Sequence, residues 1–188
     1  MANHMETTVE IENLTKAGAD YLRELFKSED NNEIWHGQLA MRMYGLTQEQ
    51  IDSPEYSRDW YIEKFGAKWM EIWTNDISDE AASFSITSAW SVPVDFLEEL
   101  VWRLNNAQGT KNVLASGTYI DESYNPSGVF AIAHQSTDAE DVFDDENIDY
   151  DRLDEDFDDY NDEIGDKLQE ELTIIKAYTI SYIEQLND

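Results

Sequence analysis

Hydrophobic and polar residues follow two periods along the first 135 residues of the chain. Alternation over Thr8–Leu14, Lys68–Thr74 and Ser83–Trp90 predicts three strands, since successive side chains of a strand point to opposite faces. Apolar runs over Val113–Ile120 and Gly128–His134 predict two more strands. The pattern therefore indicates a sheet to which most of this region contributes.

Helical periods separate these strands. A helix is predicted over Ala17–Lys27, and its inward residues are Ala19, Leu22, Leu25 and Phe26. Pro93 begins a second helix, with Phe96, Leu97, Leu100, Val101 and Leu104 facing inward. A shorter helix over Ser57–Phe65 ends at Gly66. The order is close to βαββαβ, which predicts an α+β, ferredoxin-like fold: an antiparallel sheet with helices on one face.

The C-terminal region carries a helical apolar stripe in an acidic background. The stripe predicts a helix over about 149–170, and its members are Tyr150, Leu153, Phe157, Tyr160, Ile164 and Leu168. Residues 172–186 fit either a strand or a helix, and we favour a helix. We therefore expect a ferredoxin-like domain over 1–137 and an acidic, largely helical extension over 138–188 that packs on it.

Two short segments, Phe65–Trp69 and Ser88–Pro93, carry a resemblance to a known family. The first is similar to the Gly-Thr-Lys-Trp-Asp segment, and the second to the Thr-Ala-Trp-Ser-Pro-Pro segment, of the YubB-type ferredoxin-like domain family of phages and plasmids. Tyr119–Glu122 and Gly128–Phe130 resemble its last strand pair, and MANH followed by TVEIE resembles its start. The resemblance covers about residues 1–135 and departs at Ala67, Glu71 and Val92. It implies the same fold and an origin in a mobile element, and it implies no reaction.

The net charge changes the picture most. The 188 residues contain 42 Asp and Glu against 12 Lys and Arg, which gives a formal charge of −30. Residues 138–171 alone hold 18 acids and 2 bases. A charge of this size opposes compaction and attracts basic partners, and it repels nucleic acid. Direct binding to DNA or RNA is therefore not expected.

Composition also limits the possible chemistry. The chain has no cysteine, which excludes disulfides and thiolate catalysis. No apolar run approaches 18 residues, and the N-terminus has no basic start followed by an apolar run. We therefore expect no membrane span and a cytoplasmic location, in the host cell if the origin is a mobile element.

The sequence offers no catalytic constellation. The three histidines, His4, His36 and His134, lie far apart, and Glu33–His36 is a single Glu-x-x-His where a di-iron site needs two. The acidic segment lacks the glycine of a calcium-binding loop. We predict that the protein is not an enzyme and has no cofactor and no dedicated metal site. Most of the six tryptophans are expected in the core, and Trp69 and Trp73 on one side of the sheet.

The acidic segment is the candidate functional site. Helical carboxylates three or four residues apart lie about 5–6 Å apart at Cβ, close to the spacing of phosphates along one DNA strand. Asp151, Glu155, Asp158 and Asp162 predict one such row, and Asp145, Asp149, Asp156, Asp159 and Glu163 a second. The full set of expected phosphate-mimicking residues is Asp144, Asp145, Asp149, Asp151, Asp154, Glu155, Asp156, Asp158, Asp159, Asp162 and Glu163.

These rows predict a DNA mimic. Its partner is expected to be a basic DNA-binding protein of the host, either a defence nuclease such as a restriction enzyme or a CRISPR effector, which it inhibits by occupying the DNA-binding surface. Alternatives remain: a non-inhibitory regulatory module with a basic partner, or an acidic protein that binds divalent metals weakly. Exposed apolar surface on the sheet or over 172–186 also leaves a homodimer open.

Overall fold

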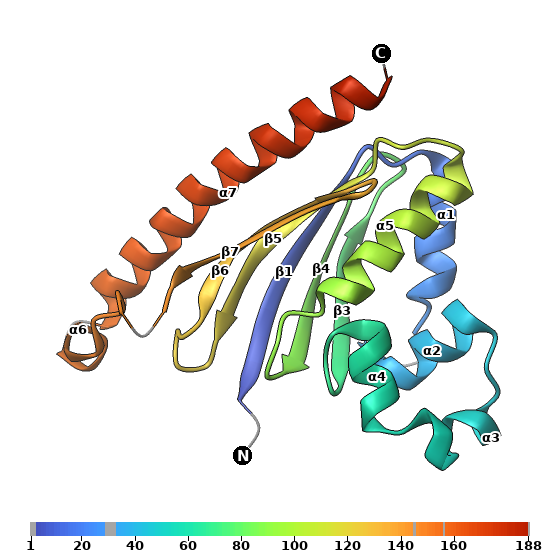
Figure 1. The fold of residues 1–188 in the computed structure, drawn as a ribbon, viewed down its shortest axis with the longest axis horizontal. Coiled ribbons are helices and arrows are strands. Elements are labelled where there is room, and N and C mark those ends of the chain that lie inside the picture. Colours follow the sequence, from blue (N-terminus) through green and yellow to red (C-terminus); the bar gives the residue numbers. More distant parts are fainter. Residues whose placement is uncertain (1–2, 29–32, 145, 156, 188) are drawn as a thin grey trace.

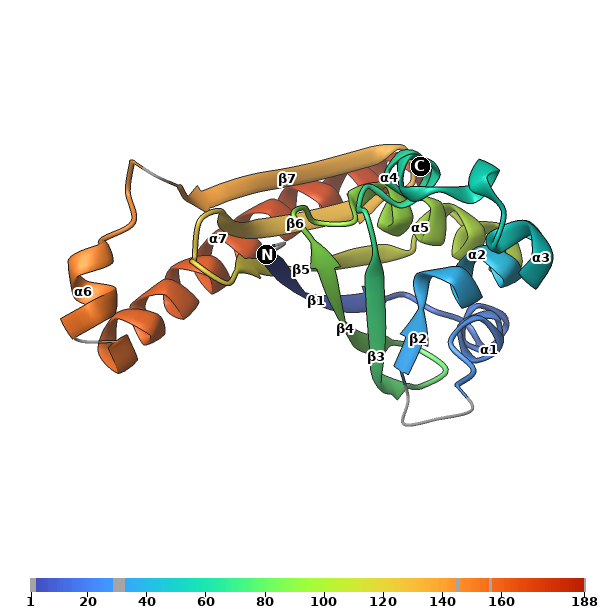
Figure 2. The same ribbon diagram turned by 90° about the horizontal axis from the view of Figure 1, so that it is seen from below.

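The structure is a computed structural model that describes residues 3–28, 33–144, 146–155 and 157–187; the side chains of residues 154, 155 and 187 are not described. In this part of the chain, seven strands form one antiparallel sheet in the order β2-β3-β4-β1-β5-β6-β7 (Figures 1 and 2). The strands are β1 (His4–Glu12), β2 (Glu33–Trp35), β3 (Met70–Ile77), β4 (Ala82–Ala89), β5 (Leu114–Asp121), β6 (Ser127–Ala133) and β7 (Ser136–Phe143).

Helices lie on both faces of this sheet. They are α1 (Lys16–Leu25), α2 (His36–Tyr44), α3 (Gln48–Ile51), α4 (Arg58–Phe65), α5 (Val94–Gln108), α6 (Tyr150–Glu155) and α7 (Phe157–Asn187), with a 3₁₀ turn η1 at Pro54–Tyr56. Figures 1 and 2 show α1 and α5 on one face and the long α7 on the other. The prediction of an α+β protein is thus confirmed.

The expected ferredoxin-like arrangement, with helices on one face of the sheet, is wrong: the described residues form seven strands where five were predicted, and helices lie on both faces. The elements β1, α1, β3, β4, α5 and β5 do follow the predicted order, and their strands are neighbours in the sheet. The predicted strand over Gly128–His134 is β6, which pairs with β5, while β2 and β7 are additional strands at the two edges of the sheet. The expected domain boundary at residue 137 falls inside β7, so the sheet continues into the acidic segment.

The first hydrophobic core lies between the sheet and the α1–α5 face. Strand β1 alternates strictly, with Met5, Val9 and Ile11 buried. The predicted inward residues of α1 and α5 are all buried in this core, among them Leu22 and Phe96, which are fully covered. Gly66 ends α4 in the left-handed conformation (φ 75°), as predicted, because glycine adopts positive φ without strain.

The second core lies under α7, which packs against β5, β6 and β7. Tyr160, Ile164 and Leu168 of the predicted stripe are buried there. Leu172, Ile175 and Ile183 continue the buried face, so residues 172–186 form a helix as favoured.

The start of the predicted stripe departs from this pattern. Tyr150 and Phe157 are nearly half exposed, and Leu153 is only partly buried. The prediction of a single helix over 149–170 is wrong, because α6 and α7 are separate helices. Residues at helical spacing therefore do not share one buried face when the spacing is counted from one helix into the other.

The tryptophans are also less buried than predicted. Trp35, Trp73, Trp90 and Trp102 are 38–52% exposed, and Trp60 and Trp69 are partly buried. The prediction that most of them lie in the core is wrong. Trp35 and Trp73 lie on the sheet face opposite the α1–α5 core, and smaller residues such as Ile34 and Ile72 fill the core at these strands.

Candidate functional site

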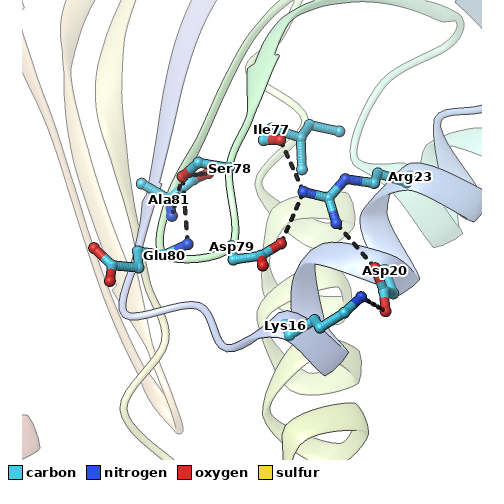
Figure 3. A network of polar contacts seen from close by, with 8 residues as sticks. All are labelled: Lys16, Asp20, Arg23, Ile77, Ser78, Asp79, Glu80 and Ala81. Atoms are coloured by element: carbon cyan, nitrogen blue, oxygen red, sulfur yellow. Dashed lines mark hydrogen bonds and ion pairs between the residues drawn. The ribbon is translucent and has the colours of Figure 1, made fainter.

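The distribution of bases decides which carboxylates are neutralised within the protein. All twelve Lys and Arg lie in the described ranges. Arg23 of α1 pairs with Asp20 at 2.9 Å and with Asp79 of the β3–β4 turn at 3.0 Å, and it donates to the carbonyl of Ile77 (Figure 3). Lys16 reaches the other oxygen of Asp20 at 2.6 Å. The network joins α1 to the turn and neutralises the charges of Asp20 and Asp79.

Few bases serve the acidic segment. Lys176 of α7 pairs with Glu12 and lies 3.9 Å from Glu10, so it neutralises β1 instead. Lys167 lies over the ring of Phe143, 4.8 Å from its centroid. Among the described residues, Arg152 is the only base in an ion pair with an acid of residues 138–171. Most of the negative charge of this segment is therefore uncompensated.

The predicted site residues fall on three elements. Asp151 lies on α6, while Asp158, Asp159, Asp162 and Glu163 lie on α7, and all five are exposed. Asp144 and Asp149 are exposed in the connection between β7 and α6. Asp145 and Asp156 lie outside the described residues. Asp154 and Glu155 belong to α6, but their side chains are not among those described.

Neither predicted row exists as one helical line. The row from Asp151 to Asp162 crosses from α6 to α7, which point in different directions (Figure 2). The second row begins in the loop before α6. A continuous row does exist on α7 and includes two residues that the prediction left out: Asp158, Asp162, Asp166 and Glu170. All four are exposed at i, i+4 spacing, and we call them the α7 row.

The α7 row borders a hollow. A cavity of about 390 Å³ is lined by Ile120 of β5 and, on α7, by Asn161, Asp162 and Asp166. Two residues of the row, Asp162 and Asp166, thus line this hollow. The spacing of four residues was the signal that would have extended the predicted site to Asp166 and Glu170.

Other predicted residues hold the local structure. The Asp144 carboxylate accepts from the Glu146 amide at 2.9 Å, and the Asp149 carboxylate accepts from the Arg152 amide at 3.2 Å at the start of α6. Such carboxylates satisfy free backbone amides in turns and at helix starts. Asp144 and Asp149 are therefore occupied by this chain's own backbone.

Glu163 is also engaged. Hydrogen bonds from Arg152 lower the pKa of its carboxyl below the usual range. Arg152 in turn lies over the ring of Tyr160, 4.5 Å from the ring centroid. Glu163 thus belongs to the contact between α6 and α7. Its negative charge is neutralised by Arg152, unlike the charges of the α7 row.

The histidines do not converge. His36 begins α2 and meets Tyr61 edge-on at 4.4 Å, and burial lowers the pKa of His36. His134 lines a different cavity, of about 430 Å³, with Glu98 and Trp102 of α5. No group of three or more His, Asp or Glu side chains that could hold a metal ion occurs among the described residues.

Comparison of the chain with protein-family models, curated proteins and solved structures gives no match. The resemblance to the YubB-type family therefore rests on the short segments alone. None of the helices in the described ranges has the length and apolar character needed to cross a membrane.

Proposed function

We propose that this protein binds the basic DNA-binding surface of another protein in place of DNA and thereby inhibits it. The observation that carries the proposal is the α7 row: four exposed carboxylates at regular spacing, none of them paired with a base of this chain. Positive side chains that hold successive phosphates find a comparable series of charges along α7.

The row is held on a fixed support. The opposite side of α7 is buried against the sheet through Tyr160, Ile164, Leu168 and Leu172. Since the helix is already docked, little conformational freedom remains to be lost when a partner binds, and that favours affinity. A solvated, unstructured acidic tail lacks this advantage.

The class of target follows from the charge and from the family resemblance. A net charge of −30 opposes the binding of nucleic acid and favours a strongly basic protein, with association rates that fall as salt rises. If the origin is a mobile element, the basic surfaces worth occupying are those of host defence proteins, in the host cytoplasm. We therefore propose a restriction enzyme, another defence nuclease or a CRISPR effector as the target.

The test begins with affinity capture from host lysate at about 100 mM salt and again at about 500 mM salt. Screening lengths fall from about 10 Å toward 4–5 Å over this range, so partners held only by diffuse charge are lost. The retained protein is then assayed for binding to labelled duplex DNA with increasing amounts of the inhibitor. We expect stoichiometric loss of DNA binding.

A matched pair of variants locates the effect. One variant changes the α7 row to amides (Asp158→Asn, Asp162→Asn, Asp166→Asn and Glu170→Gln). The control removes the same charge from four exposed acids elsewhere (Glu24→Gln, Glu49→Gln, Glu55→Gln and Glu122→Gln). We expect the first to weaken inhibition about 100-fold, equivalent to about 3 kcal/mol, and the control only a few-fold. Equal losses in both variants contradict a specific α7 site.

A further inference from the structure

Part of the sheet face that carries α7 is not covered by it. The helix lies over β5, β6 and β7, while the outward residues of β1 and β4, among them Glu6, Thr8 and Ser85, remain at the surface. A polar, solvated face is ordinary for an antiparallel sheet. Two large aromatic residues at the β2–β3 edge, Trp35 and Trp73, are not ordinary there, since they are 51% and 38% exposed.

Each of these tryptophans faces a glutamate on the neighbouring strand. Trp35 of β2 is the cross-strand partner of Glu71 on β3, and Glu33 of β2 is the partner of Trp73 on β3. Between them Ile34 and Ile72 point to the opposite face and are fully buried, which fixes the orientation of both strands. We call Glu33, Trp35, Glu71 and Trp73 the Trp–Glu square.

The spacing of the square follows from sheet geometry. Directly opposed residues have Cβ atoms about 4.5–5.5 Å apart, and alternate residues of one strand are about 6.6 Å apart. Each indole therefore lies within reach of a carboxylate, across the strands and along them. An aromatic face beside a carboxylate is the combination that a guanidinium group binds, by stacking on the ring while donating to the oxygens.

No base of this chain fills the square. All twelve Lys and Arg are described, and none of them pairs with Glu33 or Glu71 or lies over Trp35 or Trp73. Trp90 is the contrast within the same molecule, because Arg58 and Lys68 lie 5.2 and 4.8 Å from its ring centroid. Trp90 thus forms cation–π contacts within this chain, whereas Trp35 and Trp73 form none with the described residues.

The environment of the Glu71 carboxyl favours the binding of a cation beside it. Partial burial raises its pKa, and the nearby carboxylates of Glu33 and Glu6 raise it further, while His4 acts in the opposite direction. Its charged form is thus disfavoured in the free protein, and an arriving cation relieves that cost.

We propose that the Trp–Glu square is a docking site for a protein segment that presents two arginine side chains two residues apart. In an extended segment these side chains point to the same side at about 6.6 Å, which matches the spacing within the square. Arginine fits better than lysine because its flat, forked group stacks and forms two parallel hydrogen bonds at once. This site is separate from the α7 row and does not depend on the mimicry of DNA.

The probe that tests the proposal is the peptide acetyl-Arg-Val-Arg-amide, added to the full-length protein at about 150 mM salt. The indole N–H signals of the tryptophans are followed by nuclear magnetic resonance and assigned by single Trp→Leu variants. We expect the signals of Trp35 and Trp73 to shift and those of Trp90 and Trp102 to stay. Trp102 is the matched control, since it is 52% exposed and lies on α5, against the other face.

Two variants and one altered peptide separate this site from general attraction to an acidic protein. The pair Glu33→Gln and Glu71→Gln keeps the side-chain shapes, and we expect it to weaken peptide binding at least fivefold. The α7 row variant is expected to weaken it less than twofold. A peptide with citrulline in place of both arginines keeps the shape without the charge and is expected not to bind.

Either of two results overturns the proposal. One is the absence of shifts at Trp35 and Trp73 at millimolar peptide. The other is binding that the Glu33→Gln/Glu71→Gln variant leaves unchanged, because the peptide then sits elsewhere. These results leave the proposed function intact, which fails only if the α7 row is dispensable for displacing DNA.

Discussion

Arg152 of α6 forms a bidentate ion pair with Glu163 of α7. Its Nη1 and Nη2 atoms donate hydrogen bonds to the two carboxylate oxygens at 2.7 and 2.8 Å. The residues are eleven positions apart, so the pair closes the corner between the two helices. The amide of Asp149 donates to the hydroxyl of Tyr160 at 2.9 Å and supports the same corner. The contact between α6 and α7 therefore determines where the acids of α6 lie relative to those of α7.

Breaking the pair is expected to release α6 while leaving the sheet intact. In Arg152→Gln, amide hydrogen exchange of Arg152 and Leu153 is expected to become faster, while the amides of β1 and β5 keep their rates. Exchange measured by nuclear magnetic resonance gives the comparison. Asp158→Asn is the control, because Asp158 is exposed and has no partner in the described chain. Equal acceleration in both variants contradicts the pair's role.

Acid is expected to have the same effect as the Arg152 variant. The pKa of Glu163 is lowered in the folded protein, so the stabilisation by this pair is present above the ordinary glutamate pKa. It is lost as the pH falls through the lowered value. The protection of the α6 amides, taken relative to their intrinsic exchange rates at each pH, is therefore expected to fall as the pH drops below the ordinary glutamate pKa in the native protein, and to change less in Arg152→Gln.

Gly128 is expected to tolerate no side chain. A Cβ atom there meets the carbonyl oxygen of Glu140 on β7 at 2.1 Å and the hydroxyl of Tyr119 at 2.4 Å, so backbone has to move. We expect Gly128→Ala to lower the free energy of unfolding by about 3 kcal/mol. Gly165→Ala is the control: it meets nothing within 4 Å and is expected to stabilise α7 by about 1 kcal/mol. Urea unfolding of both variants checks the sign of each change.

The docking of α7 is expected to be a large part of the stability. Ile164 is 1% exposed, so Ile164→Ala removes buried apolar contacts and is expected to cost about 2–5 kcal/mol. Ile174 on the same helix is 43% exposed, and Ile174→Ala is expected to change the stability by less than about 0.5 kcal/mol. If the two variants unfold alike, α7 is not docked in the free protein.

The amphipathic patterns of α1 and α5 were predicted correctly from the sequence, because burial on one side of a continuous helix follows directly from local spacing. The helix α5 is the best case, with its proline start and its five predicted inward residues all buried. The strand β7 was missed, since Thr137–Asp141 are exposed on both faces and give no alternation. Its place in the sheet comes from pairing with β6 across a turn in which Gln135 has φ 61°, without the usual Asn-Gly signal.

The candidate site was predicted in composition but not in geometry. The exposure of Asp158, Asp159 and Asp162 followed from the charge and the apolar stripe. The break between α6 and α7 did not, because no proline or glycine marks it and because the Arg152–Glu163 contact spans eleven residues. The Trp–Glu square was also missed, since it depends on the register of β2 against β3, which no local pattern contains.

The α7 row is expected to weaken the fold that presents it. Like charges four residues apart on a helix destabilise it by about 0.2–0.5 kcal/mol for each pair. Asp162, Asp166 and Glu170 form two such pairs, whereas Asp158 lies in the first turn, where the helix dipole favours a negative charge. We therefore expect Asp162→Asn/Asp166→Asn/Glu170→Gln to raise the free energy of unfolding by about 0.5–1 kcal/mol at low salt.

Salt distinguishes this local repulsion from the general effect of the net charge. Raising the salt from about 20 mM to about 500 mM screens surface charges, so the melting temperature of the native protein is expected to rise. The melting temperature of the triple variant is expected to rise less with salt, because part of the repulsion between its charges has already been removed. A control variant removes three distant acids (Glu24→Gln, Glu55→Gln and Glu122→Gln). The rise of its melting temperature with salt is expected to be smaller than that of the native protein and larger than that of the triple variant. If the triple variant is no more stable than this control at low salt, the row carries no special repulsion, and the case for a selected array of phosphate-like charges on α7 is lost.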